Sequence, residues 1–231
     1  MYLKRKADAY LNAWKSDPNR SPLIIKGPRQ VGKTETIDYF AAHNYRSVVE
    51  INFVEEPKYR AITADGYGAN TIVRNISLID PAKKFIPGDT LIFFDEIQAH
   101  PDIVTALKFF KIDGKYDVIC SGSMLGISYK QIESNSVGYK TDYEMRSLDF
   151  EEFLWARGYD EAVIESMFTH LCDATPFSEV EMNVFSTAFM DYCVLGGMPA
   201  VVASHIRTGT FEGTLQLQRQ LILDYQEDIR K

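Results

Sequence analysis

A glycine-rich stretch near the N-terminus has the residue types that bind a polyphosphate. Residues 27–34 read GPRQVGKT, which fits the pattern G-x-x-x-x-G-K-[ST]. Glycines let such a loop turn its backbone N–H groups inward and approach a phosphate closely, and a helix opening at Gly32 would point its positive end at the same group. The pattern therefore predicts a phosphate-binding loop made of Gly27, Pro28, Arg29, Gln30, Val31, Gly32, Lys33 and Thr34.

Two side chains at the end of this loop carry its charge chemistry. Lys33 would reach the β- and γ-phosphates of a nucleotide as a point charge, and the Thr34 hydroxyl would be a ligand of Mg²⁺. The match lies between an apolar run at residues 22–25 and a helical stretch at residues 33–43, as the mechanism requires. This context disfavours the alternative, a glycine turn with a surface lysine. The loop therefore predicts ATP and Mg²⁺ as ligands.

Two adjacent carboxylates supply the second half of the predicted site. Asp95 and Glu96 follow the apolar run LIFF at residues 91–94, which has the composition of a buried parallel strand. Ligands of α/β sheets bind at the carboxyl ends of the strands. We therefore expect Asp95 to hold Mg²⁺ and Glu96 to accept a hydrogen bond from the water that attacks the γ-phosphate. A solvated helix N-terminus is the alternative, which the preceding phosphate loop disfavours.

Hydroxyl and cationic candidates for the same site have weaker sequence signals. A hydroxyl of Ser121 or Ser123, after a further apolar run, would bond the γ-phosphate or the attacking water and report the nucleotide state; an ordinary strand-end turn is the equal alternative. Lys140, Arg146 and Arg157 lie downstream, but each is more commonly a solvated side chain than a catalytic cation. In enzymes of this kind a neighbouring subunit often supplies that cation.

The elements that would position these residues alternate between strand and helix. A helix is expected over residues 2–16, followed by strands at 22–25, 47–53, 90–94 and 116–120. Helices are expected between these strands at 33–43, within 57–80 and at 101–111. The alternation predicts an α/β fold, a parallel sheet with helices on both faces and right-handed crossovers.

Residues beyond 147 have a different character, because their apolar spacing is helical throughout. Helices are expected at 148–158, 161–172, 179–195 and 214–229, with a Gly-Gly-Met-Pro turn before the last. We therefore expect two parts, an ATP-binding core at residues 1–147 and a smaller helical appendage at residues 148–231.

Composition excludes several classes of protein. Hydrophobic residues make up 45% of the chain and charged residues 25%, as in ordinary globular proteins, and the net charge of −7 argues against non-specific attraction to nucleic acid or anionic membrane. No apolar stretch reaches the roughly 18 residues of a membrane span. Cys120, Cys172 and Cys193 lack metal-ligand spacing, and no histidine has a ligand partner nearby. We expect reduced thiols, no zinc and a cytoplasmic location.

Five segments in fixed order resemble the bacterial and archaeal AAA-type ATPases that carry a C-terminal domain of unknown function. The segments are PLIIKGPRQVGKT, LIFFDEIQ, VICSGSMLG, MRSLDFEEFL and VLGGMPAVV, and the resemblance covers nearly the whole chain, from residues 2–16 to the end QRQLILDYQEDIRK. The resemblance implies an AAA-like P-loop NTPase fold in which residues 27–34 bind phosphate and Mg²⁺. It also implies the roles given above for Asp95 and Glu96, and a polar sensor at Ser121 or Ser123.

The sequence departs from this family at two places. Members often have Gly-Arg where this chain has Gly138, Tyr139 and Lys140, which weighs against a catalytic cation at that position. Members also usually continue past the equivalent of Lys231, so the resemblance implies a truncated chain and a further region beyond it.

Three functions fit these residues. The first is an ATPase whose Mg²⁺-dependent hydrolysis of ATP to ADP drives or switches a conformational change in the helical part. The second is a scaffold that binds ATP without hydrolysing it, and the third is a small-molecule kinase. Glu96 suits activation of water, which a kinase must exclude, and residues 123–147 contain a single arginine, fewer than a kinase lid needs. We expect a homo-oligomer or a protein partner through the helical part, and neither membrane nor direct nucleic-acid binding.

Overall fold

The structure is a computed structural model that describes residues 1–123, 136 and 138–230. The segment VICSGSMLG extends past this range, so Met124 to Gly126 lie outside the described residues. By its internal contacts the chain divides into a core unit, Ala7–Met145, and a helical unit that combines Met1–Lys6 with Arg146–Lys231. The chain therefore passes between the two units twice, after Lys6 and after Met145.

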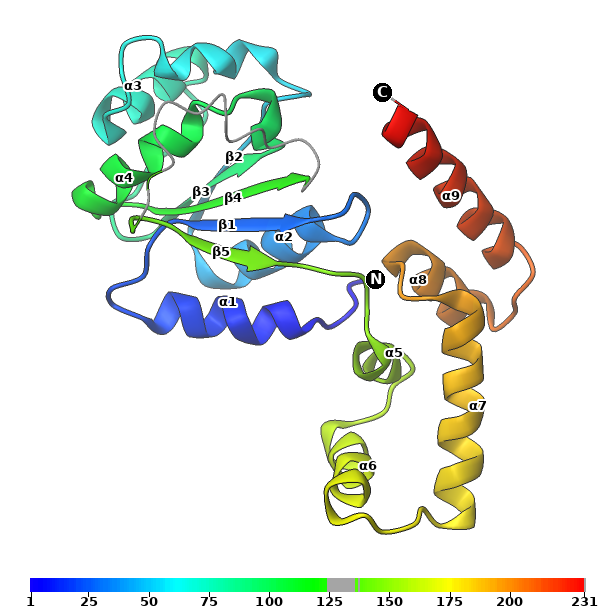
Figure 1. Cartoon of the computed structure of the whole chain (residues 1–231). Helices are drawn as coiled ribbons and strands as arrows, with labels where there is room; N and C mark the ends of the chain where they lie inside the picture. Colours follow the sequence, from blue (N-terminus) through cyan, green and yellow to red (C-terminus); the bar gives the residue numbers. More distant parts are fainter. Residues whose placement is uncertain (124–135, 137, 231) are drawn as a thin grey trace. The chain divides into compact units, whose positions relative to one another are not determined.

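The core unit is built on a parallel sheet of five strands in the order β2-β3-β4-β1-β5 (Figure 1). The central strands are almost continuously apolar, as strands covered on both faces must be. The expected α/β fold with a parallel sheet is confirmed. The strands are β1 (Leu23–Gly27), β2 (Ser47–Asn52), β3 (Thr90–Asp95), β4 (Asp117–Ser123) and β5 (Thr141–Glu144).

Alternating side chains of β3 pack into apolar clusters on the two faces of this sheet. Leu91 and Phe93 pack with α1 (Lys6–Ser16) and α2 (Lys33–Asn44). Ile92 and Phe94 pack on the opposite face with α3 (Ala69–Ile79), α4 (Ile103–Asp113) and the short helix η1 (Pro57–Thr63). These helices flank the sheet in Figure 1. The carboxyl ends of the parallel strands therefore share one edge, where polar groups from distant positions meet.

Two features of the core unit differ from the sequence expectations. The strand β5 was not expected, because its sequence TDYE is short, mostly exposed and without apolar alternation. Ser121 to Ser123 belong to β4 and are not a turn after it, because β4 pairs with β1 as far as Gly27. The backbone ladder thus extends an apolar strand through residues that favour turns on their own.

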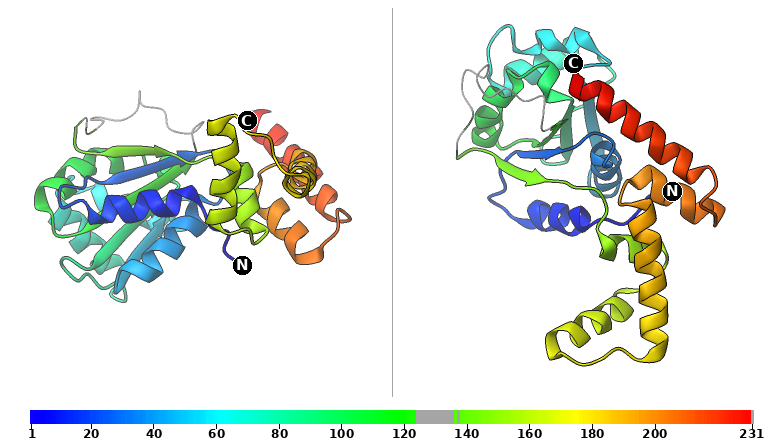
Figure 2. Two further views of the ribbon diagram at one scale, coloured as in Figure 1. Left: turned by 90° about the horizontal axis from the view of Figure 1, so that it is seen from below. Right: turned by 45° about the vertical axis from the view of Figure 1, so that its right-hand side comes forward.

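The helical unit contains five helices in its described part, and Figure 2 shows α7 as one long helix between α6 and α8. One apolar cluster joins Leu3, Leu148, Phe153, Leu195, Val201, Val202 and Leu221. A second joins Leu154, Ile164, Met167, Phe185 and Ala188. The helices are α5 (Phe150–Ala156), α6 (Glu161–Asp173), α7 (Glu179–Leu195), α8 (Pro199–Thr208) and α9 (Thr214–Arg230). The sequence did not predict α8, although proline often occupies a first helical position.

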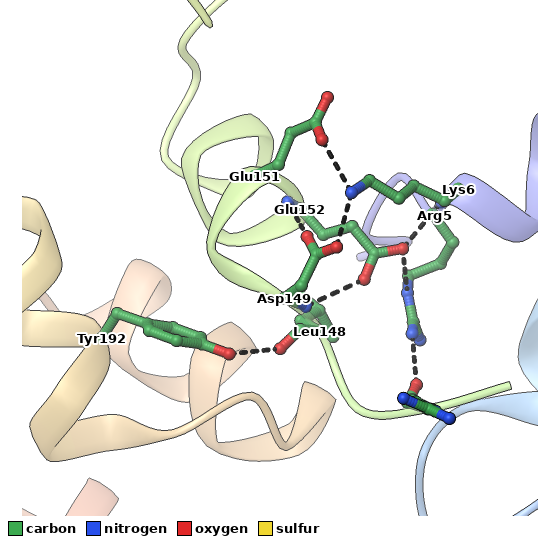
Figure 3. A network of polar contacts seen from close by, with 8 residues as sticks. Arg5, Lys6, Leu148, Asp149, Glu151, Glu152 and Tyr192 are labelled. Carbon is green, nitrogen blue, oxygen red and sulfur yellow. Dashed lines mark hydrogen bonds and ion pairs between the residues drawn. The ribbon is translucent and has the colours of Figure 1, made fainter. Parts of the chain in front are cut away.

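The first residues of the chain join the helical unit through a buried ion pair (Figure 3). Arg5 Nε donates to Glu152 Oε1 at 3.1 Å, with side chains that are 5% and 6% exposed. Arg5 Nη2 donates to the Arg146 carbonyl at 2.6 Å, and the Lys6 backbone N–H donates to Glu152 Oε1 at 2.7 Å. The helix expected from residue 2 therefore begins only at Lys6. The expected boundary at residue 147 placed residues 1–6 with the core, whereas these contacts hold them to the start of α5.

Within the described ranges, no helix combines the length and the apolar character that crossing a membrane requires.

Candidate nucleotide site

The glycine-rich stretch connects β1 to α2 at the carboxyl edge of the sheet. Gly32 precedes α2 with a φ of 89°, and Gln30 has a φ of 62°, so two residues of the loop adopt the left-handed conformation. Glycine adopts it without a steric penalty, whereas a glutamine there is uncommon. Among the described residues, no side chain caps the N-terminus of α2. An anion would therefore complement the backbone N–H groups of its first turn.

Lys33 is curled back onto its own loop. Its Nζ donates to the carbonyls of Gly27 at 3.0 Å and Pro28 at 2.7 Å, and the residue is only 8% exposed. Burial lowers the pKa of Lys33, while the negative charges of Glu96 and Asp95 act in the opposite direction. The buried Lys33 cation thus lies within the field of the two carboxylates, at the place where a triphosphate would add further negative charge.

Asp95 is the centre of a hydrogen-bond cluster at the end of β3. Its Oδ2 accepts from Thr34 Oγ1 at 3.1 Å, and its Oδ1 accepts from the backbone N–H of Glu96 at 2.9 Å and from the Ser121 hydroxyl. The residue is 3% exposed. A carboxylate and a hydroxyl beside a phosphate-type loop form the hard oxygen donor set that Mg²⁺ takes together with phosphate oxygens. The residues present therefore fit Mg²⁺.

Glu96 leaves the strand in the left-handed conformation, with φ 54° and ψ 46°. Its carbonyl accepts from the Ala99 N–H at 2.9 Å, which starts the one-turn helix η2 (Ile97–Ala99). Its carboxylate accepts from Gln98 Nε2. Left-handed backbone is costly for a residue other than glycine and is concentrated at functional sites. Among the neighbouring charges that affect the pKa of Lys33, that of Glu96 has the largest effect.

The two candidate sensor serines occupy different positions in β4. Ser121 pairs with Ile25 and is fully buried, and its hydroxyl donates to Asp95 inside the protein. Ser123 pairs with Gly27, at the first position of the glycine-rich loop, and is 8% exposed. Ser121 therefore contacts Asp95 and Ser123 lies beside the loop, and a sensor role for either serine stays a prediction.

Two of the three candidate cations, Lys140 and Arg157, contact acidic side chains, and the third, Arg146, belongs to the helical unit. Lys140 Nζ contacts both carboxylate oxygens of Asp142, at 2.7 and 2.9 Å. Residue 141 pairs with Leu23, the first residue of β1, so Lys140 lies at the amino edge of the sheet and not at the loop edge. Arg157 Nη1 donates to Asp191 within the helical unit at 2.6 Å, and Arg146 also belongs to that unit.

Three residues near the site were not predicted from the sequence. Asn52 Nδ2 lies 3.5 Å from Asp95 Oδ2, and its place at the end of β2 was a signal that the carboxyl-edge rule could have used. The Met145 N–H donates to the Lys26 carbonyl at 2.7 Å, a contact that depends on the unexpected strand β5. Gln98, two positions after Glu96, is the last residue of the segment LIFFDEIQ, but we predicted no role for it.

A glycine-rich loop between β1 and α2, with carboxylates at the end of the interior strand β3 of a parallel sheet, defines the class of P-loop nucleotide-binding domains. The chain belongs to the AAA domain family, whose model matches residues 19–154, more than half of the sequence. It is therefore a member of the AAA-type P-loop ATPase family, a class whose members generally bind ATP. This confirms the family resemblance at the level of AAA-type ATPases.

One of the similar solved structures is that of C. elegans PCH-2. It aligns with a TM-score of 0.40 and 11% sequence identity, over 75% of this chain and 48% of PCH-2. The chain thus spans about half the length of that protein. Among curated proteins, none matches this sequence.

Proposed function

We propose that this protein is a Mg²⁺-dependent ATPase that converts ATP and water to ADP and phosphate. The observation that carries the proposal is the hydrogen bond of 3.1 Å between Thr34 Oγ1 and Asp95 Oδ2. It joins the phosphate-type loop to the acid pair, and so assembles a metal-binding hydroxyl, a carboxylate and the neighbouring Glu96 at one edge. Membership of the AAA domain family supports the same activity.

Each residue has a defined task in this reaction. The backbone of residues 27–33 binds the phosphates, and the Lys33 ammonium contacts the β- and γ-phosphate oxygens. Glu96 accepts a hydrogen bond from the attacking water and takes its proton as the water oxygen bonds to the γ-phosphorus and the bridging oxygen leaves with ADP. Mg²⁺, held by Thr34 and Asp95, would neutralise charge on the β- and γ-phosphate oxygens. Ser121 keeps the Asp95 carboxylate in position.

We also propose that hydrolysis switches the helical unit. The support lies at Met145, the last residue of the core unit, whose N–H donates to Lys26 immediately before the glycine-rich loop. The next residue, Arg146, belongs to the helical unit, and its carbonyl accepts from Arg5. A change in the loop would thus reach the helical unit through one peptide bond. Hydrogen exchange in residues 145–156 should differ between the ATP-analogue and ADP states; identical protection favours the passive scaffold.

Phosphate release from the purified protein tests the proposed reaction. We expect release that depends on Mg²⁺ and occurs without any added acceptor. Lys33→Ala should abolish binding of a fluorescent ATP analogue, and Glu96→Gln should bind the analogue normally while hydrolysis falls by about 10²–10⁴-fold. Background turnover by the wild-type protein with Mg²⁺ would favour the scaffold, and transfer to an added acceptor would favour the kinase. Unchanged affinity in folded Lys33→Ala would reject the loop assignment.

A further inference from the structure

We propose that Gln98 is a positioning residue that holds the Glu96 carboxylate in its working orientation; this inference rests on the proposed ATPase function. Gln98 Nε2 donates a hydrogen bond to Glu96 Oε2. A carboxylate can only accept hydrogen bonds, so this contact fixes which end of the amide faces Glu96. The amide thereby occupies one carboxylate oxygen and leaves the other to accept from the attacking water.

The other end of the amide shows that this orientation has a cost. Gln98 Oε1 is buried and has no hydrogen-bond partner among the described residues. Buried polar atoms are nearly always paired, and an unpaired one is destabilising. An apolar side chain of the same length would remove this penalty. The presence of glutamine here is therefore explained by its contact with Glu96, and not by its contribution to folding.

The backbone around Gln98 is held firmly enough for such a role. Ile97, between Glu96 and Gln98, is fully buried in the core, and the His100 N–H closes η2 on the Ile97 carbonyl at 3.1 Å. The His100 ring lies 3.0 Å from Thr63 Oγ1. The side chains of Glu96 and Gln98 therefore project from one anchored turn, so the Gln98 amide can hold the Glu96 carboxylate in a fixed position.

The chemistry of the amide suits a brace beside a general base. It is neutral over the whole working pH range, so it donates to Glu96 without adding a charge that would compete with Lys33 for the carboxylate. The amide also neither releases a proton nor takes one from water. Gln98 would therefore fix the geometry of Glu96 and leave the proton transfer to Glu96 alone.

Gln98→Met tests the inference, because methionine has a similar length and carries neither the donor nor the unpaired acceptor. We expect kcat to fall by about 10- to 10²-fold, the loss typical of a misplaced catalytic group. The KM for ATP and the affinity for a fluorescent ATP analogue should change less than about twofold, since the loop is untouched. The unfolding temperature should be equal or higher, because a buried unpaired acceptor is gone.

A matched substitution in the helical unit has the opposite signature. Gln218 Nε2 donates to the carbonyls of Val194 and Leu195 at 3.2 and 3.1 Å, a structural contact at the end of α7. Gln218→Met should lower the unfolding temperature and leave kcat unchanged. The double variant Glu96→Gln, Gln98→Met should be no slower than Glu96→Gln alone, because a brace has no function without the base that it holds.

Different results identify which idea fails. Wild-type turnover in Gln98→Met, or a further loss in the double variant, overturns the role of Gln98 and leaves the ATPase intact. Reduced stability and weaker analogue binding in Gln98→Met also overturn it, since they indicate a structural role. Absence of Mg²⁺-dependent hydrolysis in the wild-type protein rejects the proposed ATPase, and the inference with it.

Discussion

The α-carbon of Gly27 faces the carbonyl of Met145 so closely that a β-carbon on residue 27 would lie 2.2 Å from that oxygen. The Met145 N–H donates to the neighbouring Lys26 carbonyl at 2.7 Å, so both backbone groups of Met145 meet the start of the glycine-rich loop. Packing inside the protein thus requires a glycine at the first position of the loop, in addition to any requirement that a bound phosphate would impose. No positive φ is involved at this position.

Gly27→Ala should destabilise the core unit, because the added methyl group overlaps a backbone oxygen that cannot move without disturbing β5. Overpacking of this kind costs about 1–3 kcal/mol or more in the free energy of unfolding. Gly68→Ala is the control, since its β-carbon would make an ordinary contact at 3.5 Å with Thr71 Oγ1. Urea denaturation of both variants measures the difference. Equal stability of the two variants would contradict this prediction, because it would show that the Met145 backbone moves aside at little cost.

Ser121→Ala should weaken the response to Mg²⁺ while the protein stays folded. The variant removes the hydroxyl that donates to Asp95 Oδ1, and a hydrogen bond to a charged group is worth about 1.5–3 kcal/mol. The Mg²⁺ concentration for half-maximal phosphate release should therefore rise about tenfold or more. Ser123→Ala is the comparison, because Ser123 lies beside Gly27 and should change turnover without changing the Mg²⁺ requirement. A reversed pattern would exchange the roles of the two serines.

Local patterns were sufficient to predict the parts of the site that depend on neighbours in sequence. The loop at residues 27–34 is recognisable because its glycines and Lys33 have fixed spacing, and β3 because a buried parallel strand needs an apolar run. The meeting of Thr34 with Asp95 followed from the rule that parallel strands end at one edge. That rule requires only that the sheet be recognised.

Features that depend on tertiary contacts were not predictable. Strand β5 has no apolar alternation, and it forms because β1 offers an unpaired edge. Residues 2–5 have helical spacing, yet the ion pair of Arg5 with Glu152 holds them to a segment almost 150 positions away. The hydrogen bond of Gln98 to Glu96 occurs where the Glu96 backbone is left-handed, a conformation that no propensity of glutamate favours.

Glu152→Ala should destabilise the helical unit strongly. Removing one partner of a buried ion pair leaves the buried Arg5 guanidinium without the compensating charge of the Glu152 carboxylate, at a cost of about 3–5 kcal/mol in the free energy of unfolding. The exposed pair of Lys4 with Glu161 provides the control, and Glu161→Ala should cost at most about 1 kcal/mol. Denaturation followed by tryptophan fluorescence reports the change, because Trp155 lies in α5. Equal losses in the two variants would mean that the buried pair contributes no more than a surface one.

Stability should fall at mildly acidic pH because of His100. Burial lowers the pKa of His100, with the charge of Asp102 raising it and that of Arg60 lowering it further. The folded state therefore binds a proton less readily than the unfolded chain, whose histidine titrates near pH 6.5. The free energy of unfolding should be constant above about pH 6.5 and decrease as the pH falls through that value. His100→Gln should flatten this dependence, whereas the exposed His43→Gln should retain it; an unchanged slope in His100→Gln would contradict the assignment.

The isolated chain should be a slow ATPase that accelerates on association. Lys140 lies at the wrong edge of the sheet and Arg157 is paired with Asp191, so neither is placed to neutralise charge on the γ-phosphate in the transition state. A cation supplied in trans is worth about 10³–10⁵ in rate. Specific activity should therefore curve upward as protein concentration rises and subunits associate, which sedimentation measured on the same samples would follow. Fast turnover at constant specific activity in a monomer would mean that the chain completes its own site. Arg29, an exposed residue of the loop whose charge acts on Lys33, would then be the first side chain to replace.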